Sequence, residues 1–417
     1  MSSCHFKLPL MTASKKTASV YLFLSSVSIA SAALALLFAD QVLFRLINAF
    51  SAPIETARSV PMAERLTVAT YHPILGYDGI PNIRERVAGS LVEQNADGNR
   101  GPYHKCAPGQ EPATVLVSGD SFAWGYGVAE ENTVAAAVAR QYRESAGVEP
   151  VVLNFGVSGY GPDQSLLKYL LYGRECRPKL VVLMVYVGND PSEVQATVAW
   201  GAEKPRFFFS GKRLCLTNIP PPRAKGWPHS DIRSLLRRKF PWLDSEISIG
   251  PMRLSLRHSQ ALEYLSRREF LVTLGGRSAG LDRVRGGEKV QAEFKCYEDN
   301  PSNAELQSAG PLVLLARIIW RFQRVVKADG GQFRVVLIPR MEQQKQAAPD
   351  GSYIRLVQLL RQYQVPVTDF FNSDGVPPEA SLTNRADAWR ADLHLSEAGS
   401  EIVAARILHD ARRDGQL

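Results

Sequence analysis

The feature that most constrains the fold is a series of short apolar runs that begins at residue 114. Continuous runs of roughly four to eight apolar residues are typical of strands buried on both faces of a parallel sheet. Here they alternate with longer segments of helical spacing, which predicts an α/β fold with helices on both faces of the sheet. The five runs are Thr114–Val117, Pro150–Phe155, Leu180–Val187, Phe333–Ile338 and Val365–Phe370.

Helices are predicted between and after these runs, at residues 132–146, 162–174, 311–328, 353–364 and 396–413. The alternation stops between residues 195 and 300, which we interpret as an insertion or small cap after the third strand. Inside it, residues 206–210 and 212–218 are spaced to pair as a hairpin.

The N-terminal part of the chain predicts a membrane anchor. Residues 20–39 contain no charged side chain and follow three lysines. About twenty apolar residues in a helix span a bilayer, and preceding positive charges favour a cytoplasmic N-terminus. A cleaved signal peptide is the alternative, because Ala30–Ala32 has the small-x-small form of a cleavage site. The apolar run continues past that site, which favours an uncleaved signal anchor.

This topology divides the chain into four parts. We expect a cytoplasmic N-terminus at residues 1–19, a transmembrane helix at 20–39, a connector at 40–70 and one domain at 71–417. That domain would lie on the periplasmic or extracellular side of the membrane. The chain would then be a single-pass membrane protein.

Composition limits the classes of protein and partner. The sequence is 45% hydrophobic and 22% charged, as in a globular protein with a sizeable core. Its net charge of +8 favours contact with anionic surfaces such as phospholipid headgroups or acidic glycans. No nucleic-acid-binding signature accompanies this charge, so we expect no nucleic-acid partner.

Four cysteines follow the predicted anchor: Cys106, Cys176, Cys215 and Cys296. None has zinc-ligand spacing, so no metal site is predicted. An oxidising compartment favours pairing, and four cysteines allow three pairings. We expect Cys106 to pair with Cys176, because each precedes a predicted strand at the same end of the sheet. Cys215 and Cys296 both lie in the insertion and would pair with each other.

Polar and glycine-rich clusters follow the first three strands. In open α/β sheets, active sites form beyond the carboxyl ends of the strands. Ser121 follows the first strand, Gly159 lies in the glycine-rich loop after the second, and Asn189 follows the third. The hydroxyl of Ser121 is a candidate nucleophile, and the other groups are candidate oxyanion donors. Each cluster alone also fits an ordinary turn, helix cap or loop.

A candidate general base lies before the last predicted helix. Histidine is the usual base for a serine nucleophile, and a nearby carboxylate can orient its ring. His394 follows Asp392 by two residues. A lone histidine near a helix start is more often a surface or capping residue. However, His72 and His229 have no aspartate two or three residues before them.

In this order, the four clusters resemble the blocks of the SGNH (GDSL-like) hydrolase superfamily. The resemblance covers roughly residues 114–195 and 333–410. The blocks are matched by Ser121 in GDS, Gly159 in NFGVSGYG, Asn189 in GND and His394 in DLHLSEAG.

The resemblance implies a flavodoxin-like three-layer α/β/α fold with a shallow, exposed site. Ser121 would be the nucleophile and His394 the base, oriented by Asp392. The oxyanion hole would comprise the N–H groups of Ser121 and Gly159 and the side chain of Asn189. The residues that would support the site are Asp120 and Asp190.

Two departures from the family pattern concern the last block and the insertion. The usual Asp-x-x-His is replaced by Asp392-x-His394, a spacing that occurs in membrane-linked SGNH proteins that modify envelope polysaccharides. Asp387 is a lesser candidate for the orienting acid. The insertion is long for a simple esterase, and Leu75–Asn82 is similar to a segment of membrane-anchored bacterial SGNH proteins.

These observations predict a serine esterase that acts on O-acyl esters of cell-envelope carbohydrate or lipid. It would need no metal or organic cofactor, and its partners would be an acyl-ester substrate and the membrane. One alternative is an O-acyltransferase that modifies an envelope polysaccharide. Another is a catalytically inactive binding or assembly module with the same fold.

Overall fold

The computed structural model describes a large part of the chain, and the predicted anchor at residues 20–39 lies outside it. In the part described, no helix is long and apolar enough to cross a membrane. The chain divides into two compact units, and the smaller contains the hairpin of β12 (Glu246–Ile249) and β13 (Met252–Ser255). The described residues are 68–107, 109–222, 246–249, 252–255, 296–298, 310–346, 348–372, 375–382 and 384–417.

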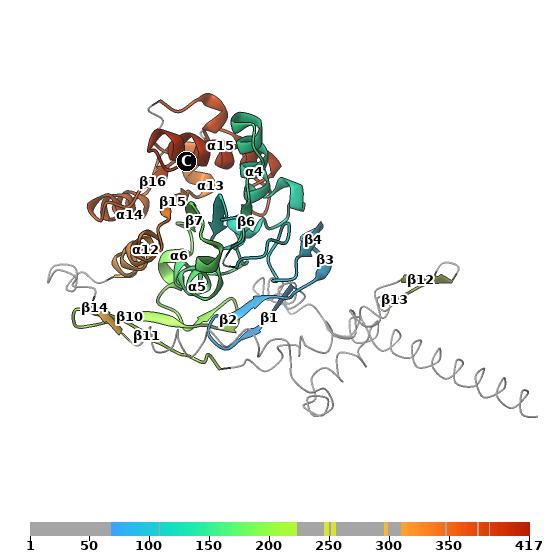
Figure 1. Ribbon diagram of the computed structural model, residues 1–417, viewed down its shortest axis with the longest axis horizontal. Helices are drawn as coiled ribbons and strands as arrows, with labels where there is room; N and C mark the ends of the chain where they lie inside the picture. The colour runs from blue at the N-terminus through green and yellow to red at the C-terminus, as the bar shows by residue number, and fades with distance from the viewer. Residues whose placement is uncertain are drawn as a thin grey trace, which may run out of the picture. The chain divides into compact units, whose positions relative to one another are not determined.

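A five-stranded parallel sheet forms the centre of the larger unit (Figure 1). Each of the five predicted apolar runs overlaps one of its strands, which confirms the predicted parallel α/β sheet. The strands lie in the order β16-β15-β7-β5-β6. If they are numbered 1 to 5 along the chain and read from the β6 edge, this order is 2-1-3-4-5, which is the flavodoxin-like order. The strands are β5 (Val115–Ser118), β6 (Val152–Asn154), β7 (Leu180–Tyr186), β15 (Gln332–Ile338) and β16 (Val367–Asp369).

Two apolar cores cover the two faces of this sheet. Because side chains alternate along a strand, Val181 and Leu183 of β7 enter one core, whereas Val182 and Met184 enter the other. The first core is covered by α5 (Pro162–Lys168), α12 (Pro311–Ala328) and α14 (Gly351–Gln362). The second is covered by α4 (Val134–Ala146) and α15 (Glu397–Arg413). The predicted three layers are therefore present.

Helix ends follow their capping residues more closely than the apolar spacing alone predicts. The hydroxyl of Thr133 accepts a hydrogen bond from Ala136 N, so α4 begins two residues after the predicted start. Ser396 caps α15 as its position predicts, since its Oγ accepts from Gly399 N at 3.1 Å. The predicted helix 162–174 is α-helical only to residue 168 and continues as a π-turn and a 3₁₀-turn.

Two antiparallel hairpins precede the sheet, where sequence spacing gave no strand signal. A buried ion pair between Lys168 Nζ and Asp78 Oδ1, 2.8 Å apart, ties the first hairpin to α5. The second hairpin packs against Trp124, just beyond the first sheet strand. The hairpins are β1 (Ala69–His72) with β2 (Gly76–Gly79), and β3 (Ile83–Val87) with β4 (Ser90–Gln94).

The described part of the insertion includes a three-stranded antiparallel sheet, and most of the remaining insertion lies outside the described residues. The predicted hairpin is present as β10 (Arg206–Ser210) and β11 (Arg213–Thr217), and β14 (Cys296–Glu298) pairs with β11. Shorter elements are α3 (Ser121–Trp124), α6 (Asp190–Glu193), β8 (Val198–Ala199), β9 (Ala202–Glu203) and α13 (Met341–Gln346).

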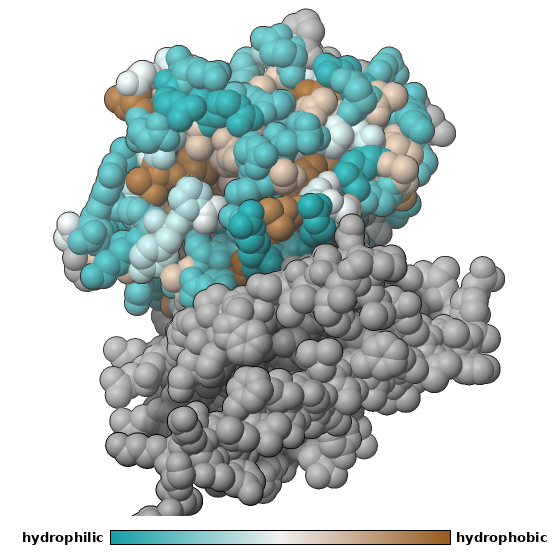
Figure 2. All heavy atoms as spheres, turned by 90° about the vertical axis from the view of Figure 1, so that its right-hand side faces the viewer, coloured by the Kyte–Doolittle hydropathy of each residue, from teal (hydrophilic) through white to brown (hydrophobic). Residues whose placement is uncertain are grey.

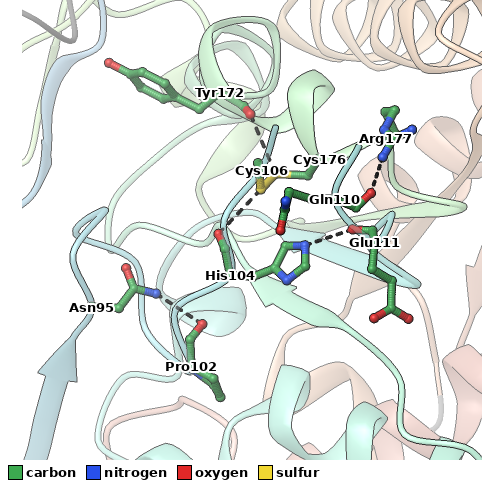
Figure 3. Close-up of a disulfide and its surroundings, with 9 residues drawn as sticks. All are labelled: Asn95, Pro102, His104, Cys106, Gln110, Glu111, Tyr172, Cys176 and Arg177. Atoms are coloured by element: carbon green, nitrogen blue, oxygen red, sulfur yellow. Dashed lines mark hydrogen bonds between the residues drawn. A yellow bond between two sulfur atoms is a disulfide. The ribbon is translucent and has the colours of Figure 1, made fainter. Parts of the chain in front are cut away.

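Both predicted disulfides are present. Cys106 pairs with Cys176, which joins the segment before β5 to the segment before β7 (Figure 3). Cys215 of β11 pairs with Cys296 of β14, inside the insertion. The pairings confirm that the two pairs of cysteines are neighbours in the fold.

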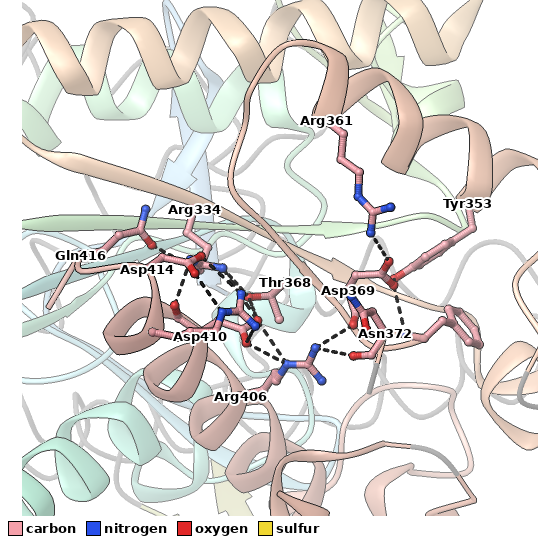
Figure 4. A network of polar contacts seen from close by, with 12 residues as sticks. Arg334, Tyr353, Arg361, Thr368, Asp369, Asn372, Arg406, Asp410, Asp414 and Gln416 are labelled. Atoms are coloured by element: carbon pink, nitrogen blue, oxygen red, sulfur yellow. Dashed lines mark hydrogen bonds and ion pairs between the residues drawn. The ribbon is translucent and has the colours of Figure 1, made fainter. Parts of the chain in front are cut away.

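A buried polar network fixes the C-terminal helix to the sheet (Figure 4). Arg334 of β15 is fully buried and donates to Gln416 Oε1 at 2.7 Å and to the carbonyl of Asp410 at 3.2 Å. Thr368 of β16 donates to Asp410 Oδ2 at 2.9 Å. Because α15 directly follows His394, these bonds help to fix the position of the segment that carries this histidine.

The face of the larger unit shown in Figure 2 is mainly hydrophilic around small apolar patches.

Candidate active site

Ser121 lies at the start of a short helix beyond the carboxyl end of β5. Gly119 makes the turn possible: its φ is +147°, and a Cβ there would lie 2.6 Å from the carbonyl oxygen of Met184. Asp120 caps the helix, since its Oδ1 accepts from Phe122 N at 2.9 Å. The first N–H groups of a helix have no partner within the helix, so the turn presents both the Ser121 hydroxyl and a backbone donor.

His394 lies next to Ser121, although 273 residues separate them in the chain. Its Nε2 is 2.9 Å from Ser121 Oγ, within hydrogen-bond reach for a base and its nucleophile. The imidazole packs between two aromatic rings, with centroid distances of 5.1 Å to Phe122 and 4.6 Å to Tyr126. These contacts hold the ring in place over α3 and remove much of it from water.

The surroundings of the predicted base, His394, favour its neutral form. Burial lowers the pKa of His394 below its ordinary value of 6.5, whereas the negative charge of Asp392 acts in the opposite direction. A neutral imidazole at pH 7 can accept the proton of Ser121. The aromatic surroundings therefore favour the protonation state that a general base requires.

This tuning predicts the pH dependence of activity. Activity should rise as the pH rises through the pKa of His394, so kcat/KM should reach half of its plateau below pH 6.5. The substitution Asp392→Asn removes the charge that raises this pKa, and should move the midpoint to a lower pH. Both midpoints can be measured with an uncharged aryl ester. An Asp392→Asn profile shifted to higher pH would contradict this account of the base.

The predicted orienting acid, Asp392, makes only a long contact with His394. Its Oδ1 lies 3.5 Å from His394 Nδ1, and Arg390 Nε lies 3.3 Å from both carboxylate oxygens. The lesser candidate, Asp387, instead pairs with Arg385 at 2.7 Å. The structure thus places Asp392 beside His394 and shares its carboxylate with a neighbouring arginine.

The glycine-rich loop after β6 packs directly on α3, which begins at Ser121. A Cβ on Gly156 would lie 2.4 Å from Trp124 N, so the close approach requires glycine at this position. Asn154 Oδ1 accepts from Gly156 N at 3.0 Å and fixes the start of the loop. Gly159, in the same loop, has a φ of +83°. The loop that carries this predicted oxyanion donor therefore runs beside α3.

Asn189 lies at the end of β7, immediately before α6. Its Nδ2 donates to Glu193 Oε1 at 2.9 Å, which fixes the orientation of the amide. Sequence reasoning missed Glu193, although a spacing of four residues within one helical segment was a signal that could have found it. An amide held by a carboxylate through one N–H keeps its second N–H available for another acceptor.

Asp120 and Asp190, the two aspartates predicted to support the site, are buried. Asp190 Oδ2 accepts from Tyr186 N at 2.9 Å, which closes the turn after β7. Burial raises the pKa of Asp190 well above its ordinary value, and the negative charges of Asp120 and Glu193 raise it further. These aspartates therefore shape the turns that carry Ser121 and Asn189.

Within the described residues, no group of His, Cys, Asp and Glu is arranged to hold a metal ion.

The chain has weak structural likenesses to several solved structures. No protein-family model and no curated protein matches the chain. The crystal structure of TesA is 10% identical, with a TM-score of 0.34 over 72% of this chain and 98% of that one. A candidate GDSL-like lipase from Parabacteroides merdae is 10% identical, with a TM-score of 0.33 over 74% of this chain and 97% of that one. At such scores the likenesses carry no argument about chemistry, which rests on the contacts of Ser121 and His394.

Proposed function

We propose that the protein is a serine hydrolase of the SGNH type that acts on O-acyl esters. The observation that carries this proposal is the 2.9 Å contact between Ser121 Oγ and His394 Nε2 at the carboxyl edge of a parallel sheet. A serine in an ordinary turn and a histidine at the surface are not expected to lie at this distance unless they act together. The contact therefore favours an enzyme over a binding module that merely keeps the fold.

The geometry supports a two-step acyl transfer. Ser121 Oγ attacks the acyl carbonyl while His394 Nε2 accepts the serine proton, and Asp392 stabilises the imidazolium. The oxyanion would be bound by the N–H groups of Ser121 and Gly159 and by the amide of Asn189. Collapse of the intermediate expels the alcohol, which takes the proton from His394. Water then attacks the acyl-enzyme by the same route and releases the acid.

A sugar hydroxyl in place of that water would make the same site an O-acyltransferase for an envelope polysaccharide. The two activities differ only in the acceptor of the second step. We propose hydrolysis as the basal reaction. Measuring the ratio of free acid to acylated sugar, with increasing sugar acceptor, distinguishes the two: a ratio that falls to near zero would favour transfer.

We propose that the catalytic domain lies outside the cytoplasm and is tethered by residues 20–39. Two disulfides support this location, because disulfides persist in oxidising compartments and are rare in the cytosol. The substrate would then be an acyl ester of cell-envelope carbohydrate or lipid. Digestion of spheroplasts with an added protease tests the topology. A domain protected until the cytoplasmic membrane is permeabilised would contradict it.

The substitution Asn189→Ala tests the oxyanion hole. Loss of one such donor lowers kcat by roughly 10²- to 10³-fold, with little effect on KM, because the bond forms chiefly in the transition state. Steady-state kinetics on acetylated sugars and p-nitrophenyl esters measure the change. Asn132→Ala, in the turn before α4, is the matched control and should retain full activity. An Asn189→Ala enzyme as active as the wild type would contradict this assignment.

A further inference from the structure

The turn that carries His394 is tight and includes an unusual backbone conformation. Trp389 and Leu395 pair as an isolated antiparallel bridge, and Arg390 N donates to the carbonyl of His394 at 2.8 Å. Leu393 has a φ of +69° and is exposed, a conformation that bulky residues rarely adopt. Such a conformation persists only where surrounding contacts fix it. The turn therefore needs an anchor outside its own backbone.

The side chain of Arg390 supplies a contact of this kind. Its Nη1 donates to the carbonyl of Gly127 at 2.6 Å, and its Nε lies 3.3 Å from both oxygens of Asp392. Gly127 packs so closely on the guanidinium that a Cβ there would lie 2.6 Å from Arg390 Cζ. Gly127 follows Tyr126, whose ring covers His394, in the loop directly after the helix of Ser121. One guanidinium thus joins the segments that carry the two reacting groups.

We propose that Arg390 is a positioning residue that anchors the His394 turn to the loop behind Ser121 and shares the carboxylate of Asp392. This role rests on the proposed esterase function, in which Ser121 and His394 react together. Arginine suits it because its planar fork donates in two directions at once, which the point charge of lysine cannot reproduce.

The charges around His394 give this role a distinctive signature. Asp392 and Arg390 face the imidazole from its own turn, and the ionisable ring of Tyr126 faces it from the loop after α3. The carboxylate of Asp392 raises the pKa of His394, and the positive charge of Arg390 lowers it. Neutralising Arg390 removes the opposing charge and therefore raises the pKa of His394.

The test compares Arg390→Met and Arg390→Lys in the full-length protein. Hydrogen exchange at the imidazole C2 position of His394, followed by peptide mass spectrometry against pH, reports its titration without any turnover. The exchange midpoint should move to higher pH in Arg390→Met and stay near the wild-type value in Arg390→Lys, which keeps the charge. Ester kcat/KM should fall in both variants, by about ten- to a hundredfold, because neither side chain bridges both segments.

The matched control is Arg385→Met. Arg385 pairs with Asp387 at the same spacing of two residues, 2.7 Å apart and exposed to solvent. This variant should keep both the wild-type exchange midpoint and the wild-type activity. A control that shifts the midpoint as Arg390→Met does would overturn the proposal.

Two further outcomes would also overturn it. One is an Arg390→Met protein that melts as the wild type does and keeps the wild-type exchange midpoint. The other is full activity in Arg390→Lys, which decides the matter even if Arg390→Met does not fold. Absence of ester turnover in the wild type would refute the proposed function alone, because the exchange midpoint needs no substrate. If the wild type hydrolyses esters but Arg390→Met leaves the exchange midpoint of His394 unchanged, only the role of Arg390 is refuted.

Discussion

Replacing Ser121 by alanine should lower kcat on acyl esters by about 10⁶-fold, to the background rate. The hydroxyl lies 2.9 Å from its base, and no other group in the described site is placed to attack in its stead. The fold should survive, because Asp120 still caps α3 and only one oxygen is lost. Steady-state turnover of p-nitrophenyl acetate and acetylated sugars measures the change.

Ser145→Ala, on the exposed surface of α4, is the control for this substitution and should retain wild-type kcat. A folded Ser121→Ala protein that keeps more than about one percent of wild-type turnover would exclude Ser121 as the nucleophile, since loss of a serine nucleophile leaves far less.

Replacing His394 by alanine should cause a loss of similar size, about 10⁶-fold in kcat. Without the imidazole, the serine hydroxyl keeps its proton and attacks slowly. The double variant of Ser121 and His394 should be no less active than either single variant, because the two groups act as one unit. The kinetics of the two single variants and the double variant on one ester, compared with the wild type, complete this double-mutant cycle.

His394→Gln accompanies this test, because alanine also empties the space between Phe122 and Tyr126. Thermal unfolding separates a loss of chemistry from a loss of structure. If each single variant retains substantial activity and the two losses multiply in the double variant, Ser121 and His394 act independently and the proposed pair is wrong.

The central sheet was predictable because buried parallel strands leave a simple signal. Leu180–Tyr186 is apolar throughout, since both of its faces enter a core. The Cys106–Cys176 disulfide could be predicted from the positions of the two cysteines in the chain, because each precedes a strand and these strands are neighbours in the sheet. Ser121 and His394 could be chosen as candidates because the order of the four clusters resembles that of SGNH hydrolases, and the structure brings the two side chains within 2.9 Å of each other.

Contacts between elements could not be predicted in the same way. Arg390 is held beside Asp392 by the loop of Gly127, which lies some 260 residues away in the chain. Arg385 and Asp387 have the same two-residue spacing but are not part of the site. The first hairpin depends on the buried ion pair of Lys168, which no local pattern reveals. Tertiary packing decides each of these contacts.

Labelling with a fluorophosphonate, followed by peptide mass spectrometry, tests the central claim most directly. The account predicts one phosphonyl adduct, on Ser121, in the folded full-length protein. It also predicts that labelling slows by orders of magnitude in His394→Ala, because the base no longer activates the hydroxyl. A folded wild-type protein that stays unlabelled, or that carries the adduct on a different residue, would contradict the assignment of Ser121 and His394 as nucleophile and base.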